Sequence, residues 1–267
     1  MPRRTLLAFA LGLVLLVTGC GGPGKTPQRV TAQPSVPAAP PPTPTPTPSP
    51  KPQPSRTTPK PKPTLRPLPK KLPAGLHRRS GSPGVALTFD DGPDPRYTPQ
   101  ILAQLRAAHV TATFCLVGKQ AKRYPHLVAQ IVREGHQLCN HSWRHDVDLG
   151  RRPAAEIRAD LERTNRAIRA AAPDAPITWF RQPGGRWTAE ELTVARQLGL
   201  RPLHWSVDPQ DWDHPPAKKI IARVESAAHH GSVVLMHDAG GDRTQTMAAC
   251  RRLIPDLKRR YGIVRLR

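Results

Sequence analysis

The sequence predicts an α/β fold in which helices surround a parallel sheet of about seven strands, preceded by a disordered proline-rich stalk. Short apolar runs recur through residues 85–267, and segments of helical periodicity separate many of them. Strands that alternate with helices form parallel sheets with the helices outside. Seven such strands can close into a barrel, and barrels of this kind carry their chemistry at the carboxyl ends of the strands.

The expected strands cover residues 85–89, 112–117, 136–139, 177–180, 203–207, 233–236 and 263–266. Four helices are expected between them, because apolar residues recur every three or four positions and so share one helix face. The four stripes are Ile101, Leu102 and Leu105; Leu127, Val128, Ile131 and Val132; Ile157, Leu161 and Ile168; and Leu192, Ala195 and Leu198. Gly135 and Gly199 stand where two of these helices would end.

Charge and proline divide the chain into two parts. Residues 1–84 hold 13 of the 41 basic residues and 21 of the 34 prolines, and they contain no Asp or Glu. Beyond residue 19 this part has too few apolar side chains to offset the entropy of ordering the chain. Residues 85–267 hold 28 basic and 19 acidic residues, a net charge of +9, and their length suits one domain with its own core.

The first residues are typical of an export signal. Arg3 and Arg4 precede an apolar run over residues 6–17, which is shorter than the roughly 18 residues that a membrane-spanning helix needs. The tetrapeptide Val-Thr-Gly-Cys that ends at Cys20 resembles a bacterial lipobox. We therefore expect a lipoprotein signal peptide over residues 1–19 and a lipid on Cys20, which would anchor the mature protein at the membrane, outside the cytoplasm. The alternative is an ordinary cleaved signal and a secreted protein.

Residues 20–82 are expected to form a disordered linker. Pro, Thr, Ser, Lys and Arg dominate this segment, a composition that favours extended polyproline II helix. Its eleven basic residues, from Lys25 to Arg79, could contact anionic wall polymers or simply keep a solvated spacer extended. A basic protein also suggests nucleic acid as a partner, but export excludes that partner.

Acidic and imidazole side chains follow two of the expected strands. Asp90 and Asp91 come at a Gly-Pro break after the first strand, so both carboxylates can face one mouth of the barrel. Adjacent carboxylates repel each other unless a cation or a proton separates them. His141 and His145 follow the third strand, spaced so that a helical turn would present both to one metal ion. A polar turn and a solvated surface helix are the plainer interpretations.

Further polar groups follow the later strands. Arg181 follows the fourth strand, and an arginine beside an aspartate that acts as a base would keep it ionised. Asp208 and Asp211 follow the fifth strand. His237 ends the sixth, where it is a candidate general acid. Each residue alone is more typical of a loop or a core, so the prediction depends on the whole set.

The set resembles the polysaccharide deacetylases with a NodB homology domain, carbohydrate esterase family four. The resemblance covers nearly all of residues 83–267, which we take as the domain. It implies a distorted (β/α) barrel and one divalent metal ion, zinc by its ligand types, or cobalt. The motifs are Thr88-Phe89-Asp90-Asp91-Gly92, His141-Ser142-Trp143-Arg144-His145, Arg181-Gln182-Pro183-Gly184-Gly185, Asp208-Pro209-Gln210-Asp211-Trp212 and Leu235-Met236-His237.

Carried over position by position, the resemblance implies catalytic roles. Asp90 would be the base and Arg181 would hold it, while His237 would be the general acid. Asp208 or Asp211 would tune His237 or support Arg181, and the sequence does not say which.

The same resemblance implies the binding residues. The metal ligands would be Asp91, His141 and His145; the Gly184 amide would help bind the oxyanion; and Trp212 and Leu235 would wall the pocket for the acetyl methyl group. Many members carry Tyr in place of Gly184. The change keeps the main-chain donor but removes the packing of that side chain.

The expected location indicates which substrate the enzyme would meet. A tethered enzyme that faces the wall meets peptidoglycan first, so the N-acetyl groups of its amino sugars are the expected target. Chitooligosaccharides, poly-N-acetylglucosamine and acetylated xylan are rivals within the enzyme class, and a catalytically idle wall-binding lipoprotein is the rival outside it. Trp143, Trp187 and Trp212 could stack on sugar rings or pack in the core.

Cys115 and Cys139 lie in consecutive expected strands, which are usually neighbours in this type of fold. A disulfide is permitted outside the cytoplasm, so we expect the two to pair and Cys250 to stay free on a late helix. Two buried, unpaired small residues are the alternative. Cysteine is not expected to bind the metal ion, because the chain contains no CxxC spacing.

Overall fold

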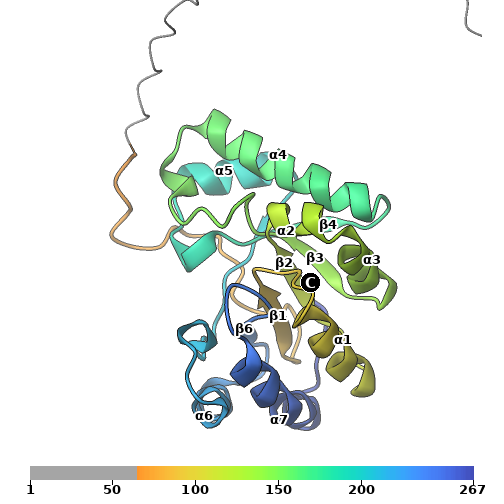
Figure 1. The fold of residues 1–267 in the computed structure, drawn as a ribbon. Helices are drawn as coiled ribbons and strands as arrows, with labels where there is room; N and C mark the ends of the chain where they lie inside the picture. The colour runs from red at the N-terminus through yellow and green to blue at the C-terminus, as the bar shows by residue number, and fades with distance from the viewer. Residues whose placement is uncertain (1–64) are drawn as a thin grey trace, which may run out of the picture. The chain divides into compact units, whose positions relative to one another are not determined.

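The core of the structure is a six-stranded parallel sheet (Figure 1). The structure is a computed structural model that describes residues 65–267, so the predicted signal peptide, Cys20 and most of the linker lie outside the described residues. The strands are β1 (Ala86–Asp90), β2 (Thr113–Leu116), β3 (Gln137–Asn140), β4 (Ile177–Phe180), β5 (Arg201–Pro202) and β6 (Val233–His237). They stand in the order β5-β4-β3-β2-β1-β6, and every pair is parallel, as predicted.

The segment that follows β5 joins the two edges of the sheet. It begins beside β4, where the Leu203 amide donates to the Phe180 carbonyl over 2.8 Å. Further along, Val207 forms a parallel bridge with Val234 of β6, and the Leu235 amide donates to the Val207 carbonyl over 2.9 Å. The expected fifth strand is therefore a crossing segment. It closes the sheet through isolated bridges, and the predicted distorted (β/α) barrel is confirmed.

The seventh expected strand, over residues 263–266, is reduced to one bridge. Ile263 pairs with Val85, just before β1. Beyond this bridge the chain turns away toward the start of β3, where the Leu266 amide donates to the Gln137 side chain over 2.8 Å. The apolar pattern that predicted a strand here serves instead to bury Leu266 beneath the sheet.

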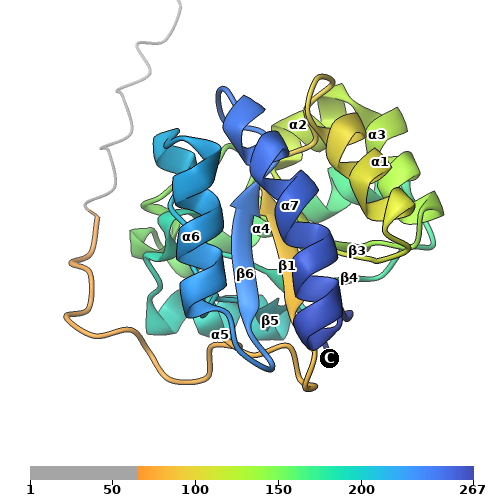
Figure 2. The ribbon, with the colours of Figure 1, turned by 90° about the horizontal axis from the view of Figure 1, so that it is seen from below.

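Seven α-helices pack around the sheet within the described residues. Four carry the predicted stripes, namely α1 (Thr98–Ala107), α3 (Pro125–Arg133), α4 (Ala154–Ala171) and α5 (Ala189–Gln197). Every stripe residue is buried except Val132 and Leu198, which are half-buried. The other three are α2 (Gly118–Arg123), α6 (Ala217–Ala227) and α7 (Thr244–Tyr261). Figure 2 shows α6 and α7 side by side against β6 and β1.

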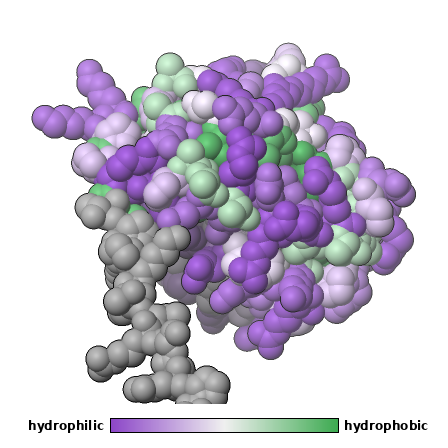
Figure 3. Space-filling view, turned by 90° about the horizontal axis from the view of Figure 1, so that it is seen from above, coloured by the Kyte–Doolittle hydropathy of each residue, from purple (hydrophilic) through white to green (hydrophobic). Residues whose placement is uncertain are grey.

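The outer faces of the helices are hydrophilic. Figure 3 looks onto a face that hydrophilic side chains mostly cover, with hydrophobic ones in small patches between them. Helix α4 shows the division, because its buried stripe is backed by exposed Arg163, Arg166 and Arg169. Among the residues that the structure describes, none of the helices combines the length and the apolar character needed to cross a membrane.

Residues ahead of β1 are bonded to the domain although they fall in the predicted linker. The His77 amide donates to the Pro202 carbonyl of β5 over 2.9 Å, and His77 forms a parallel bridge with Leu203. Arg79 forms an antiparallel bridge with Ser232, just before β6. This short stretch therefore covers the outer edge of β5.

Cys115 of β2 and Cys139 of β3 lie opposite each other in the sheet and form a disulfide, the pairing that the sequence predicts. They belong to a small hydrophobic cluster with Trp179 and Leu203 that contains no helix residue, so it fills the inside of the barrel. Cys250 of α7 is buried and free.

Candidate active site

A cavity of about 450 Å³ opens at the carboxyl ends of the strands, the edge at which such barrels carry their chemistry. Most of the predicted site residues line it: Asp90, Asp91, His141, His145, Gly184, Asp208, Trp212, Leu235 and His237. Arg181 and Asp211 stand behind the wall, and each is hydrogen-bonded to a residue that lines the cavity. The fold therefore brings clusters from distant parts of the chain into one site.

Asp90 ends β1 with its carboxylate fixed by Arg181. One guanidinium nitrogen of Arg181 donates to Asp90 Oδ1 over 2.6 Å and to Thr88 Oγ1 over 2.8 Å. Another donates to the His204 carbonyl over 3.3 Å. Arg181 is fully buried, so the ion pair lies in surroundings of low dielectric constant. The pairing leaves Asp90 Oδ2 directed toward His141 Nε2, which lies 3.6 Å away.

Asp91, His141 and His145 bring three potential metal ligands together. Their ligand atoms all lie within 4.8 Å of one another. Asp91 Oδ1 lies 3.5 Å from His141 Nε2 and 3.3 Å from His145 Nε2. This oxygen is buried, has no hydrogen-bond partner among the described residues and faces two imidazole nitrogens, which fits an atom that binds a cation. Two imidazoles and a carboxylate are typical zinc ligands, so the residues fit a divalent metal ion.

The protonation of these groups also suits a metal ion. His141 Nδ1 lies 2.8 Å from the Arg181 carbonyl, which can only accept, so we assign the proton to Nδ1 and the lone pair to Nε2. Burial lowers the pKa of His145, which favours its neutral form. Burial alone would raise the pKa of Asp91, but the nearby histidines hold it below its usual value, so Asp91 is ionised.

Left-handed backbone conformations aim the ligand side chains. Asp91 has φ 76°, Ser142 has φ 61° and His145 has φ 58°, values that residues other than glycine rarely adopt. At Asp91 this conformation breaks the alternation of a strand, so its side chain shares a cavity with that of Asp90. The predicted helical turn that carries His141 and His145 is wrong. An irregular turn brings the two rings together instead, with centroids 5.1 Å apart.

His237 ends β6, in register with Asp90 of β1, and is held by Asp211. Its Nδ1 lies 2.7 Å from Asp211 Oδ1, and its amide donates to Asp211 Oδ2 over 2.9 Å. Burial alone would lower the pKa of His237, but the charge and hydrogen bond of Asp211 raise it to about 9. His237 therefore carries a proton at neutral pH, and Nε2 is the donor left for the cavity.

The structure separates the two aspartates that the sequence could not assign. Asp211 is the partner of His237. Asp208 Oδ1 accepts the Gln210 amide over 2.8 Å and so stabilises a turn at the rim of the cavity. Among the described residues Asp208 bonds neither His237 nor Arg181, whose partners are those given above.

Gly184, Trp212 and Leu235 lie where the resemblance implies, at the rim and wall of the cavity. Gly184 is exposed with φ 63°, and Trp212 is 47% exposed, whereas Leu235 is buried. The other two tryptophans proposed as sugar platforms are in the core, because Trp143 is 7% exposed and Trp187 is 0% exposed.

Three residues that the sequence analysis did not name also line the cavity, Trp205, Gly240 and Arg243. Trp205 packs on His204 with ring centroids 4.0 Å apart. Gly185 makes room for it, because a Cβ at that position would lie 2.7 Å from the indole. Arg243 stands six positions after His237, beyond the segment Asp-Ala-Gly-Gly-Asp, and that short spacing is the one sequence signal that pointed to it.

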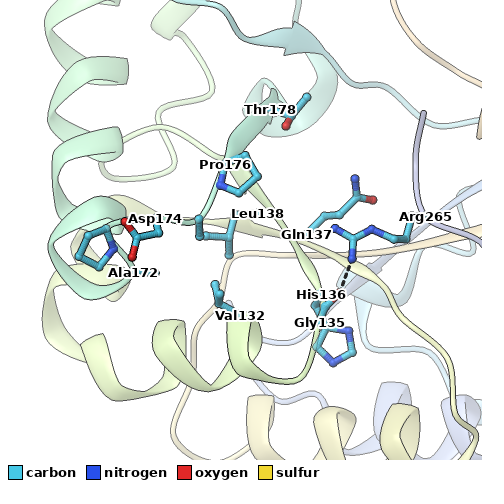
Figure 4. Close-up of a pocket in the computed structure, with 12 residues that line it drawn as sticks. Val132, Gly135, His136, Gln137, Leu138, Ala172, Asp174, Pro176, Thr178 and Arg265 are labelled. Carbon is cyan, nitrogen blue, oxygen red and sulfur yellow. Dashed lines mark hydrogen bonds between the residues drawn. The ribbon is translucent and has the colours of Figure 1, made fainter.

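A second cavity, of about 350 Å³, lies at the opposite edge of the sheet (Figure 4). Residues at the start of β3 and β4 line it, among them His136, Leu138 and Pro176. Arg265 lies beside them and donates to the Gly135 carbonyl over 2.7 Å. Within residues 65–267 the one cluster of three potential metal ligands is the cluster at the carboxyl edge, so this second cavity offers no equivalent chemistry.

Comparison with known proteins identifies the family. The sequence profile of the polysaccharide deacetylase family matches residues 77–203. The chitooligosaccharide deacetylase of Sinorhizobium fredii is 40% identical over 196 residues, which are 70% of this chain and 91% of that protein. The chain belongs to the polysaccharide deacetylase family. As a polysaccharide deacetylase it is an enzyme of the class that the five motifs implied.

Solved structures of deacetylases share its fold. A peptidoglycan N-acetylglucosamine deacetylase is similar with a TM-score of 0.67 and 34% identity, over 72% of this chain and 89% of that chain. A CE4 family pseudoenzyme from Bacillus anthracis is similar with a TM-score of 0.65 and 30% identity, over 72% of this chain and 67% of that chain. Because the same fold is found in a deacetylase and in a pseudoenzyme, the chemistry of this chain has to be argued from its site residues.

Proposed function

We propose that this polysaccharide deacetylase is a metal-dependent hydrolase that removes N-acetyl groups from cell-envelope polysaccharide, with the amino sugars of peptidoglycan as its main substrate. The observation that carries the proposal is the grouping of Asp91, His141 and His145 in one cavity with Asp90 and His237. Amide hydrolysis needs an electrophile, a base for the attacking water and an acid for the leaving amine, and these side chains can supply each of them.

Asp91, His141 and His145 would hold the ion, and their types suit Zn²⁺, with Co²⁺ as another divalent ion that fits. When bound, the ion supplies Lewis acidity, which polarises the acetyl carbonyl and lowers the pKa of a water ligand. Three protein ligands leave room for water and substrate, as in other catalytic zinc sites. The Arg181 carbonyl would orient His141 for this task through Nδ1.

Asp90 would take the proton from the attacking water. Its Oδ1 is fixed by Arg181, and its Oδ2 faces the ligand cluster. The buried guanidinium favours the ionised carboxylate and holds it in one orientation, which is what a general base requires. Arg181 therefore acts through Asp90 and makes no contact with the substrate in this scheme.

His237 would give a proton to the sugar nitrogen as the C–N bond breaks. An amide nitrogen leaves readily only when it is protonated, so the acid must hold its proton at the working pH. The pKa of about 9 that Asp211 confers on His237 meets this need. The acetyl group departs as acetate, the sugar keeps a free amine, and Asp211 stays ionised beside the histidine.

The acyl group would be held by a main-chain donor and an apolar wall. The Gly184 amide would donate to the oxyanion, and its place at the cavity rim supports this role. Trp212 and Leu235 would contact the acetyl methyl group, and both line the same cavity.

The location is part of the proposal. A lipid on Cys20 would anchor the enzyme outside the cytoplasm, and a Cys20→Ala variant would then leave the membrane fraction. The Cys115–Cys139 disulfide supports an oxidising compartment. An enzyme there meets peptidoglycan, the substrate named for one similar structure. Chitooligosaccharides, named for the relative from Sinorhizobium fredii, are the second substrate class.

The test is acetate release by the purified full-length protein from cell-wall sacculi, chitooligosaccharides and acetylated xylan, measured side by side before and after chelation. We expect the fastest release from sacculi, loss of activity on chelation, and recovery with zinc or cobalt. Activity that survives exhaustive chelation would contradict the metal dependence. Release from chitooligosaccharides alone would make them the substrate in place of peptidoglycan. A metal-loaded protein that releases no acetate from any of the three polymers would support the idle wall-binding alternative.

A further inference from the structure

Arg243 is a buried arginine whose hydrogen bonds all go to main-chain carbonyls. It is 2% exposed and stands immediately before the first residue of α7. Its Nε donates to the Ala239 carbonyl over 2.7 Å, Nη1 to the Asp211 carbonyl over 2.9 Å and Nη2 to the Gly240 carbonyl over 2.8 Å. Among the described residues no carboxylate forms an ion pair with it, and the groups in direct contact with its charge are these three carbonyls.

This is an unfavourable place for a cation. The amino terminus of a helix carries the positive end of the helix dipole, which repels a guanidinium. The position before a helix is ordinarily taken by Ser, Thr, Asp or Asn, which accept hydrogen bonds from the first turn. Burial of a charge without a counter-ion adds a desolvation cost. An apolar side chain would avoid the repulsion by the helix dipole and the desolvation cost, so Arg243 is better explained by the segments it holds than by stability.

The two segments that Arg243 joins both belong to the active site. Asp211 lies on the first segment and positions His237 through both carboxylate oxygens. Gly240 lies on the second and packs directly on the predicted ligand Asp91, because a Cβ at that position would lie 2.3 Å from Asp91 Oδ2. The carbonyls of Asp211 and Gly240 bind adjacent nitrogens of one planar guanidinium, so their separation is fixed by its geometry.

We propose that Arg243 is a positioning residue for deacetylation, whose guanidinium clamps the Asp211 segment to the Gly240 loop and so fixes His237 relative to Asp91. This inference rests on the roles proposed above for Asp211 and His237. Arg243 acts through main-chain groups. A lysine in its place would retain the charge and a methionine would have a similar length, but neither reproduces the three directed N–H donors.

The test compares Arg243→Met with Arg251→Met, a matched control that removes an exposed arginine from the same helix. We expect Arg243→Met to lower kcat for acetate release about 10²-fold with KM close to the wild-type value, because a small misplacement of catalytic groups costs about this much. A second readout needs no substrate. The Nδ1 proton that His237 shares with Asp211 should give a far-downfield proton NMR signal, assigned by its loss in His237→Gln. Arg243→Met should lose this signal to exchange with water, and Arg251→Met should keep it.

Arg243→Lys guards against a variant that does not fold, since it keeps the charge but presents its donors from one nitrogen. We expect it to fold and to show the same two changes in weaker form. The proposal is overturned if a folded Arg243 variant keeps both the NMR signal and the kcat of the Arg251→Met control. A wild-type enzyme that releases no acetate would contradict the proposed function alone, because the NMR comparison would still decide the role of Arg243. If the wild-type signal is not resolved, the kcat comparison decides it.

Discussion

The two edges of the sheet carry cavities of similar size, about 450 Å³ at the carboxyl edge and 350 Å³ at the amino edge, and each contains a buried histidine. At the amino edge, burial lowers the pKa of His136 to about 4, and the more distant charge of Glu134 does not reverse this. At the carboxyl edge, burial acts in the same direction on His237, but Asp211 raises its pKa to about 9. Burial alone therefore yields a neutral histidine, and a hydrogen-bonded carboxylate is what makes the other one an acid.

The residues that line the two cavities also differ in backbone conformation. At the carboxyl edge Asp91 and His145 adopt left-handed conformations without being glycines. The left-handed residue in the amino-edge cavity is Gly135, which adopts this conformation at little cost. Strain of this kind is retained where the surrounding structure enforces it, and it commonly marks a functional site.

The largest expected effect separates the metal ligands from the base at the carboxyl edge. His141→Ala should lose both metal and activity, whereas Asp90→Asn should keep its metal and lose activity about 10³-fold, because it lacks only the proton acceptor. Metal content after dialysis and the rate of acetate release check both variants. The comparison of the two edges predicts that His136→Gln keeps metal and activity. Equal metal loss in Asp90→Asn and His141→Ala would contradict the division of roles.

The second expected effect is a lower pKa of His237, which would make this histidine neutral like His136. In Asp211→Asn the pKa of His237 should fall, since burial is no longer opposed, so the alkaline limb of the kcat profile should move to lower pH and the rate at pH 8 should drop about 10²-fold. The raised pKa of His237 also stabilises the wild-type fold at pH values below 6.5, and this contribution is lost as the pH rises toward 9. The Asp211→Asn variant should lack it. Rate profiles from pH 5 to 10 test this, and an unshifted alkaline limb would count against Asp211 as the cause.

The third effect concerns stability alone. The Cys115–Cys139 bond closes a sequence separation of 24 residues, so replacing both with Ser should lower the free energy of unfolding by about 3 kcal/mol. The bond lies inside the barrel and does not line the cavity, so kcat of the folded variant should stay near the wild-type value. Denaturant unfolding measures the change, with Cys250→Ala as a control that breaks no disulfide. A variant as stable as this control would show that the bond contributes little.

The smallest effect belongs to the amino edge. The folded protein resists protonation of His136 down to about pH 4, while the unfolded chain accepts the proton near pH 6.5. Stability should therefore fall as the pH drops through this range, and His136→Gln should flatten that dependence without changing kcat. Thermal unfolding at several pH values tests this, and an unchanged slope in the variant would assign the dependence to other groups.

The sequence predicted what depends on short-range pattern. The strand over Ile177–Phe180 has the predicted bounds, and the predicted site clusters meet at one edge because parallel strands end together. It did not predict the crossing segment after β5, since that path is set by closure between β4 and β6. The turn before His145 was missed because nothing in its side chains signals a left-handed conformation. Arg243 was missed because its partners are carbonyls up to 32 residues away.

The stretch around His77 has a practical consequence for anyone who shortens the chain. Its amide and its bridge to Leu203 occupy the outer side of a two-residue edge strand. A version that starts at residue 83 would leave those main-chain groups bare, and bare strand edges recruit other chains into aggregates. A soluble preparation should therefore start before Arg66, whose amide bonds the Arg151 carbonyl.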